Sequence, residues 1–100
     1  MIKPSIGRVV WFTPEKNDAL ASDQQLAALI AYVHSDRSVN LAVFDACGGG
    51  AHSRTSVTLL QGDDLPPEGG GYAEWMPFQK GQAVKHEQKE NAQIEKHETT

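Results

Sequence analysis

The chain has little cysteine and no long apolar run, and each shortage excludes a class of protein. Cys47 is the only cysteine, so one chain can form neither an intrachain disulfide nor a cysteine-based metal cluster. A reducing compartment fits this cysteine usage best. No stretch approaches the roughly 18 apolar residues of a membrane helix, and residues 1–8 contain no apolar signal segment. We therefore expect a soluble protein of the cytoplasm.

Positive charge is also scarce. The formal net charge is −4, and residues 1–78 carry five Lys and Arg residues against nine Asp and Glu residues. Proteins that bind duplex nucleic acid present a basic patch, because neutralising phosphates dominates their affinity. The sequence contains no cluster of Lys and Arg. Duplex DNA or RNA is therefore not expected as a partner.

A chain of 100 residues supplies one hydrophobic core, which predicts one domain. The apolar residues are concentrated before residue 78, whereas residues 79–100 are rich in Gln, Lys and Glu. Beyond alanine, that last stretch has only Val84 and Ile94 to bury, so a lone helix there would be marginal in water. We expect a folded domain at 1–78 and a polar helical or disordered tail at 79–100.

Five segments have the composition of β-strands bounded by turn residues, at 8–13, 26–34, 39–45, 51–60 and 72–76. The clearest is Val39 to Asp45, in which Val39, Leu41 and Val43 share one face. The segment 26–34 is rich in Leu and Ala, which also favour helix. Its short length and its neighbouring turn favour a buried strand.

Short strands, tight hairpins and no crossover helix predict a mainly β fold. We expect a small antiparallel barrel of about five strands, of the SH3-like kind, with an OB-like barrel as the alternative. The stretch Gly62 to Gly71 is predicted to be a loop, with Gly69-Gly70-Gly71 as a flexible linker.

Features that could support catalysis each have a simpler structural explanation. His34 and Asp36 could form a general base, but a hydrogen-bonded turn explains them better. No Ser, Cys or Thr has the setting of a nucleophile elbow. Gly48-Gly49-Gly50 lacks the residues of either nucleotide-binding fingerprint, so a hairpin loop is favoured. The sequence predicts a protein that is not an enzyme and has no cofactor.

A metal site is also not expected. His34 and His52 could approach each other across the sheet, but two histidines among scattered carboxylates fit almost any chain. His86 and His97 are spaced too far apart for a metal-binding helix motif.

Aromatic residues are numerous for so small a barrel. Trp11 and Phe12 are adjacent on a strand, so one of them must point away from the core. A ring left outside could pack against another subunit, or it could stack on a ligand beside an arginine. The arginines that could serve are Arg8, Arg37 and Arg54. The expected ligand-binding residues are Trp11, Tyr32, Arg37, Arg54 and Trp75.

The chain also resembles a family of small proteins encoded by tailed bacteriophages and prophages. The resemblance covers roughly residues 4–80 and is carried by the segments 7–12, 32–37, 39–45, 55–57 and 74–77. It implies a bacteriophage origin and residence in the bacterial host cytoplasm, and it implies no catalytic residues. Small phage proteins of this class include oligomeric sponges that sequester cyclic-nucleotide immune signals, and minor virion or assembly factors.

Together these observations predict a non-enzymatic homo-oligomer that holds a small anionic ligand, such as a cyclic nucleotide or an ADP-ribose derivative, against host defence. One alternative is a protein-interaction module, either a virion component or an inhibitor of a host protein. A third is a small nucleotide-acting enzyme that uses His34 or His52.

Overall fold

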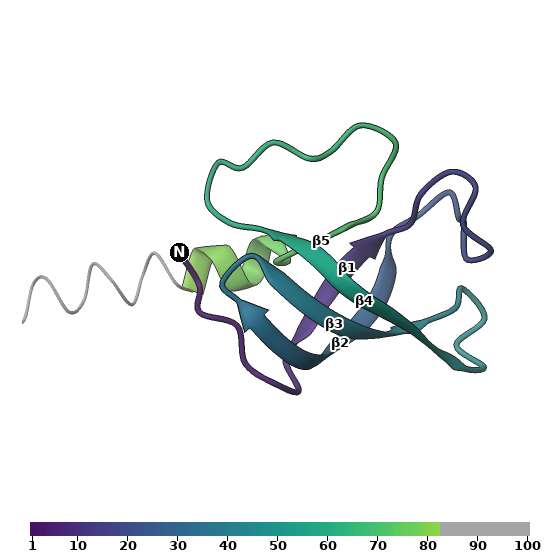
Figure 1. Ribbon diagram of the computed structural model, residues 1–100, viewed down its shortest axis with the longest axis horizontal. Coiled ribbons are helices and arrows are strands. Elements are labelled where there is room, and N and C mark those ends of the chain that lie inside the picture. Colours follow the sequence, from purple (N-terminus) through teal and green to yellow (C-terminus); the bar gives the residue numbers. More distant parts are fainter. Residues whose placement is uncertain (83–100) are drawn as a thin grey trace, which may run out of the picture.

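Five β-strands form the body of the protein in a computed structural model, which describes residues 1–82 (Figure 1). The five predicted strands are all present, with ends shifted by at most two residues. The first strand begins at Val9 rather than Arg8, and the last ends at Glu74, because a helical segment starts soon afterwards at residue 77. The strands are β1 Val9–Thr13, β2 Leu26–Ser35, β3 Ser38–Phe44, β4 Ala51–Leu60 and β5 Tyr72–Glu74.

The strands close into a barrel in the order β1-β2-β3-β4-β5. Consecutive strands from β1 to β4 pair antiparallel, and β5 closes the barrel antiparallel to β1 and parallel to β4. Apart from the closing pair β1 and β5, neighbours in the barrel are neighbours in the chain, without the crossing connection of a Greek key. This order agrees with the expected SH3-like arrangement rather than with the OB-like alternative.

Alternation along the strands sorts the side chains into a core and an outer surface. On β3, Val39, Leu41 and Val43 are buried, as the sequence predicts, while their neighbours face outward. The ambiguous segment is a strand, because β2 pairs with β1 and β3 on its two sides, and that pairing overrides the helix propensity of Leu and Ala. The core is completed by Phe12, Leu59 and Trp75, among others.

A β-bulge interrupts the pairing of β3 with β4 opposite Asn40. Strand β2 has a register shift between Ile30 and Tyr32, and β4 has one opposite Asn40, where Thr55 and Ser56 together face one residue. The side-chain Oδ1 of Asn40 accepts the backbone N–H of Ser56 at 2.8 Å. Ser56 has a φ of 51°, the one positive value at a non-glycine position among the described residues. One amide thus holds the bulge that lets the sheet close.

The connection from β4 to β5 must run back along the barrel before β5 can begin, because these two strands are parallel. It forms the long loop above the barrel in Figure 1. Its glycine run is not the flexible linker that the sequence predicts. Gly71 donates its N–H to the carbonyl of Thr13 at 2.7 Å, and a Cβ on Gly70 would lie 2.3 Å from the carbonyl oxygen of Pro14. The glycines are there because the backbones pack too closely for a side chain.

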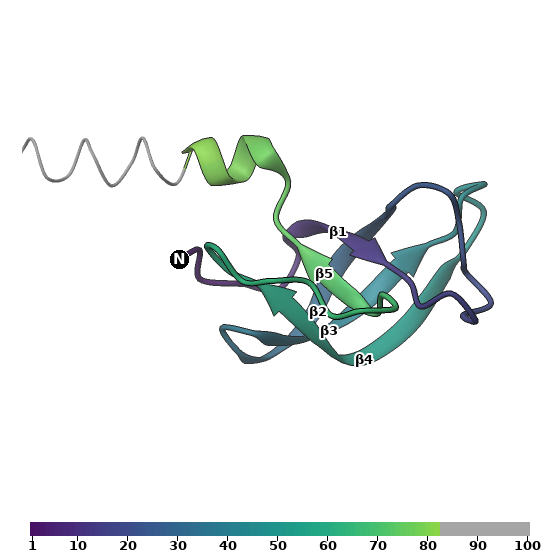
Figure 2. The ribbon, with the colours of Figure 1, turned by 90° about the horizontal axis from the view of Figure 1, so that it is seen from above.

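A helical segment covers residues 77–82 and leaves the barrel near the N-terminus (Figure 2). Pro77 occupies its first position, and the side chain of Gln79 accepts the N–H of Met76 at 2.8 Å, as in a capping box. The same side chain donates to the carbonyl of Val9 at 2.8 Å, which fastens the segment to β1. The predicted tail, 79–100, is helical as far as residue 82, and the rest lies outside the described residues.

Candidate functional site

The barrel has two ends with different surroundings. The loop end carries the connections 14–25 and 45–50, and the helix end carries residues 1–8, the β2–β3 turn and the helical segment 77–82 (Figures 1 and 2). In the part of the chain that the structure describes, no helix has the length and apolar character needed to cross a membrane.

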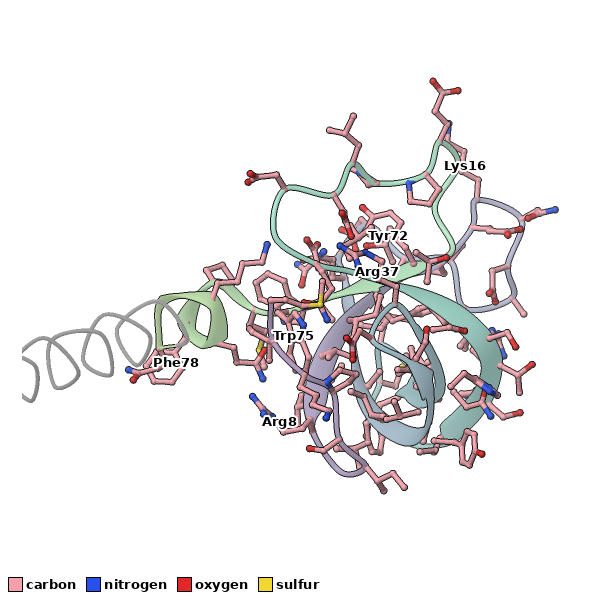
Figure 3. All side chains as sticks on the ribbon, turned by 60° about the vertical axis from the view of Figure 1, so that its left-hand side comes forward. Arg8, Lys16, Arg37, Tyr72, Trp75 and Phe78 are labelled. Atoms are coloured by element: carbon pink, nitrogen blue, oxygen red, sulfur yellow. The ribbon has the colours of Figure 1, made fainter. Side chains whose placement is uncertain are left out.

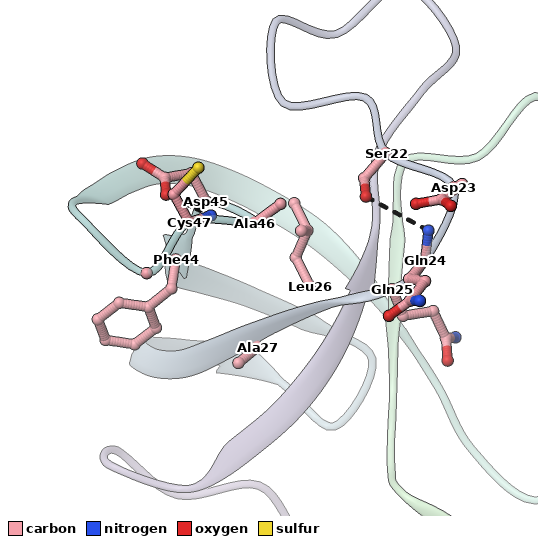
Figure 4. A pocket seen from close by; sticks show the side chains of 11 residues that line it. Ser22, Asp23, Gln24, Gln25, Leu26, Ala27, Phe44, Asp45, Ala46 and Cys47 are labelled. Atoms are coloured by element: carbon pink, nitrogen blue, oxygen red, sulfur yellow. Dashed lines mark hydrogen bonds between the residues drawn. The ribbon is translucent and has the colours of Figure 1, made fainter.

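A polar groove of about 550 Å³ lies at the loop end, between the β1–β2 connection and the β3–β4 connection (Figure 4). Its walls are residues 22–27 on one side and 44–48 on the other. Asp23 and Asp45 are its charged lining residues. Two carboxylates disfavour an anion, so this groove is not the expected site for a phosphate.

Asp45 is held rigidly at the edge of this groove. Its Oδ1 accepts the backbone N–H groups of Cys47 at 3.0 Å and Gly49 at 3.2 Å, and its Oδ2 accepts Nε2–H of His52 at 3.3 Å. The hydrogen bond from Gly49, followed by the one from His52, lowers the pKa of Asp45 below its ordinary value. The predicted hairpin loop at 48–50 is therefore organised around its own aspartate.

Arg54 projects at the loop end and closes a smaller pocket of about 210 Å³. Its Nε donates to Oδ2 of Asp18 at 3.0 Å, and its Nη2 donates to Oδ1 at 2.6 Å, so the pair is bidentate. These bonds are the largest cause of the lowered pKa of Asp18 and of the raised pKa of Arg54. The predicted phosphate contact at Arg54 is thus already occupied by a carboxylate from the β1–β2 connection.

Arg37 lies at the helix end and is also paired. Its Nε donates to Oδ2 of Asp64 at 2.9 Å, and the same oxygen accepts the backbone N–H of Gln61 at 2.9 Å. Gln61 in turn accepts a hydrogen bond from Nε1 of Trp75. The structure therefore connects two of the predicted residues, Arg37 and Trp75, through a polar network rather than through a ligand site.

Trp75 is 1% exposed, so its ring is not free to stack on a ligand as the sequence predicts. The reason is that β5 ends at Glu74, and the chain then turns the indole inward into the end of the barrel. The guanidinium of Arg8 lies 5.0 Å from the ring centroid, as Figure 3 illustrates. Among residues 1–82, Arg8 has no carboxylate partner, unlike Arg37 and Arg54.

Tyr32 is 54% exposed and points outward from β2. Its ring meets His34 edge to face, with centroids 4.9 Å apart. His34 donates from Nε2 to the side chain of Asn40 at 2.8 Å. His52 instead bonds to Asp45 in the β3–β4 connection, so the two histidines have different partners. No group of three potential metal ligands occurs in the described part of the chain.

Trp11 is half-buried on the outer side of β1, while its neighbour Phe12 is buried, as alternation requires. The five predicted ligand-binding residues thus do not converge on one site. The sequence indicates Arg8 only as a flanking cation and gives no signal for Gln61. Only the fold brings these two to Trp75, so no local pattern indicates them.

Comparison with known protein families, with curated proteins and with solved structures finds no match to this chain. Its function is therefore inferred from its own geometry.

Proposed function

We propose that this is a non-enzymatic, phage-encoded binding protein that assembles from copies of the chain and holds a small anionic ligand. A nucleotide-derived host immune signal, such as a cyclic nucleotide or an ADP-ribose derivative, has the required chemistry. Sequestering it in the bacterial cytoplasm would counter host defence. The observation that carries the proposal is Arg8, an exposed guanidinium held over an indole with no carboxylate partner among residues 1–82.

Arg8 has the surroundings that a nucleotide needs. A guanidinium pairs with phosphate oxygens in a bidentate way, and it keeps this capacity only when no carboxylate competes. The ring of Phe78 is 73% exposed at the same end of the barrel (Figure 3). An exposed ring is a stacking platform for a base. The helix end therefore offers a cation and a free aromatic face, which the loop-end groove does not.

Tyr32 extends the same region. The backbone carbonyl of Arg8 accepts the N–H of Ile30, two residues before Tyr32, at 2.9 Å. The exposed phenol therefore lies on the strand next to the proposed cation. Arg37 is at this end too, but it would first have to leave Asp64. We assign the first phosphate contact to Arg8 and a secondary role to Arg37.

The histidine contacts support binding rather than chemistry. His34 donates to an amide oxygen and His52 to a carboxylate, and among residues 1–82 neither ring is hydrogen-bonded to a hydroxyl or thiol that it could activate. This counts against the alternative of a small nucleotide-acting enzyme.

Calorimetry tests the proposal directly. The purified protein is titrated with cyclic di- and trinucleotides and ADP-ribose derivatives, and we expect heat from at least one of them. Arg8→Ala is expected to weaken that binding by about tenfold or more, since a charge-assisted bidentate contact contributes on the order of 1.5–3 kcal/mol. Lys16→Ala removes an exposed charge at the loop end and is the matched control.

Uniformly absent heat contradicts the ligand-binding proposal. A protein-interaction module then becomes the better function, and one observation favours it: several outward-facing residues of β1, β2 and β3 are apolar and are exposed or half-buried among residues 1–82. Recovery of the same host or virion protein from infected-cell lysate, with no nucleotide affinity, would select this alternative.

A further inference from the structure

One side of the barrel presents an apolar surface without a single charge. Outward-facing residues of three neighbouring strands form it, and every one of them is exposed or half-buried. We call it the outer face. It consists of Val9, Trp11, Ala27, Leu29, Ala42 and Phe44.

The strand register arranges the outer face in two rows. Val9 pairs with Leu29 and Leu29 with Ala42, which makes a row nearer the helix end. Trp11 pairs with Ala27, and the pairing of Ala28 with Val43 places Ala27 beside Phe44. These three residues make a second row nearer the loop end, parallel to the first.

Large and small side chains alternate between the rows. On β1 and β3 the larger residue, Trp11 or Phe44, is in the loop-end row, whereas on β2 the larger residue, Leu29, is in the helix-end row. Consider a second copy packed face to face with the first, related to it by a two-fold axis that lies in the interface, perpendicular to the strands and midway between the rows. The loop-end row of one copy then lies over the helix-end row of the other, and each strand lies over the same strand of its partner. Trp11 then lies over Val9 of the second copy, Leu29 over Ala27, and Phe44 over Ala42.

We propose that the outer face binds the outer face of a second copy of this chain in this two-fold arrangement. The inference rests on the homo-oligomeric form of the proposed function and identifies the interface it uses. Each large side chain meets a smaller one, which is the interdigitation that two packed sheets require. A two-fold interface must be complementary to itself, and these two rows are.

Charge at the two ends of the outer face fits the same arrangement. Asp23 and Asp45 flank it at the loop end, where they share the groove lining with Ala27 and Phe44. At the helix end, Lys80 follows Gln79, whose side chain bonds to the carbonyl of Val9, and Lys80 has no carboxylate partner in the described residues. Exchanging the rows brings the acidic end of one copy toward Lys80 of the other, while Arg8 stays over the indole of Trp75.

The rest of the chain is a poorer occupant for this surface. Residues 83–100 offer only Val84 and Ile94 as apolar side chains beyond alanine, too few to cover six. A standard interface involves roughly 20–30 residues on each side, so an interface centred on six is modest. We therefore expect a dimer with a dissociation constant in the micromolar range.

Sedimentation equilibrium over a range of concentrations tests the interface. We expect the wild-type protein to dimerise and Ala42→Lys, on the β3 side of the outer face, to remain monomeric. Thr58→Lys is the matched control, because Thr58 is exposed on β4 outside the outer face. A wild-type protein that stays monomeric at millimolar concentration, or equal effects of the two lysines, would overturn the proposal.

A size exchange tests the register. Ala42→Phe places two large rings against each other, and Phe44→Ala leaves a void, so each is expected to weaken the dimer by about tenfold. The double variant Ala42→Phe/Phe44→Ala exchanges the two sizes and should restore dimerisation. If the surface were merely sticky, Ala42→Phe alone would tighten association, and that result would overturn the two-row arrangement.

The failures of the two proposals are distinguishable. A nucleotide bound by a protein that stays monomeric overturns the interface and leaves the ligand-binding function standing. A dimer that follows the size-exchange pattern but gives no heat with any nucleotide supports the interface and contradicts the ligand.

Discussion

Trp75 donates its indole N–H to Oε1 of Gln61, 3.3 Å away, and both side chains are almost completely buried. The same oxygen accepts the N–H of Ile2 at 3.1 Å, and the amide nitrogen donates to the carbonyls of Ile2 at 2.7 Å and Asp36 at 2.8 Å. One buried amide thus joins the N-terminus, the β2–β3 turn, the end of β4 and the residue after β5. Such a network is stabilising only while all its members are paired.

Removing this amide should destabilise the fold. Gln61→Leu removes the partner of the buried indole N–H, of the N–H and carbonyl of Ile2 and of the carbonyl of Asp36, and we expect the free energy of unfolding to fall by about 2–4 kcal/mol. Urea denaturation followed by tryptophan fluorescence measures it. Gln24→Leu, at an exposed position whose side chain makes no hydrogen bond among residues 1–82, is the control. Equal stabilities of the two variants would show that Gln61 does not hold the network.

Acid should weaken the attachment of the β1–β2 connection to the barrel. The pKa of Asp18 is lowered from 3.8 in the folded protein, first by the hydrogen bonds from Arg54 and then by the N–H of Leu20. A carboxyl whose folded pKa is depressed contributes stability above its unfolded pKa, and the contribution is lost as pH falls through the folded value. The loss is therefore expected below about pH 4.

Asp18→Asn tests this dependence, because it removes the charge and keeps the shape. At neutral pH we expect a loss of about 1–2 kcal/mol, since the pair is only partly exposed. The difference between wild type and variant should shrink as the pH is lowered below 4. A difference that stays constant from pH 7 to pH 3 would contradict the assignment to ionisation of Asp18.

Two glycines give a matched test of backbone packing. Gly70 has a φ of 89°, and a Cβ there would lie 2.3 Å from the Pro14 oxygen, so Gly70→Ala should cost about 2 kcal/mol or more. Gly49 has no atom within 4 Å of such a Cβ and no positive φ, so Gly49→Ala should change stability by less than about 0.5 kcal/mol. Thermal unfolding compares them. Similar melting temperatures for the two variants would mean that the β4–β5 loop adapts.

The strands could be predicted because their signals are local. Alternation from Val39 to Val43 and the turn residues around each segment depend only on neighbours in the chain, so the five strands and the buried face of β3 follow from them. The segment 26–34 could also be predicted as a strand, because its short length and the neighbouring turn outweigh the helix preference of its Leu and Ala residues. These features required no knowledge of which strand pairs with which.

The candidate site could not be predicted in the same way, because its contacts join residues distant in the chain. Arg54 meets Asp18 and Arg37 meets Asp64 only after the barrel closes, and those pairings decide which arginine is left for an anion. The burial of Trp75 depends on Gln61, fourteen residues away.

The sequence by itself determined that this chain forms short strands with one apolar face each, because alternation and turn chemistry act over a few residues. Only the tertiary structure decided which side chains are left for partners. Cross-strand register sets the two rows of the outer face, and barrel closure frees Arg8 while pairing the other arginines. Both depend on where distant strands meet, which no local pattern encodes.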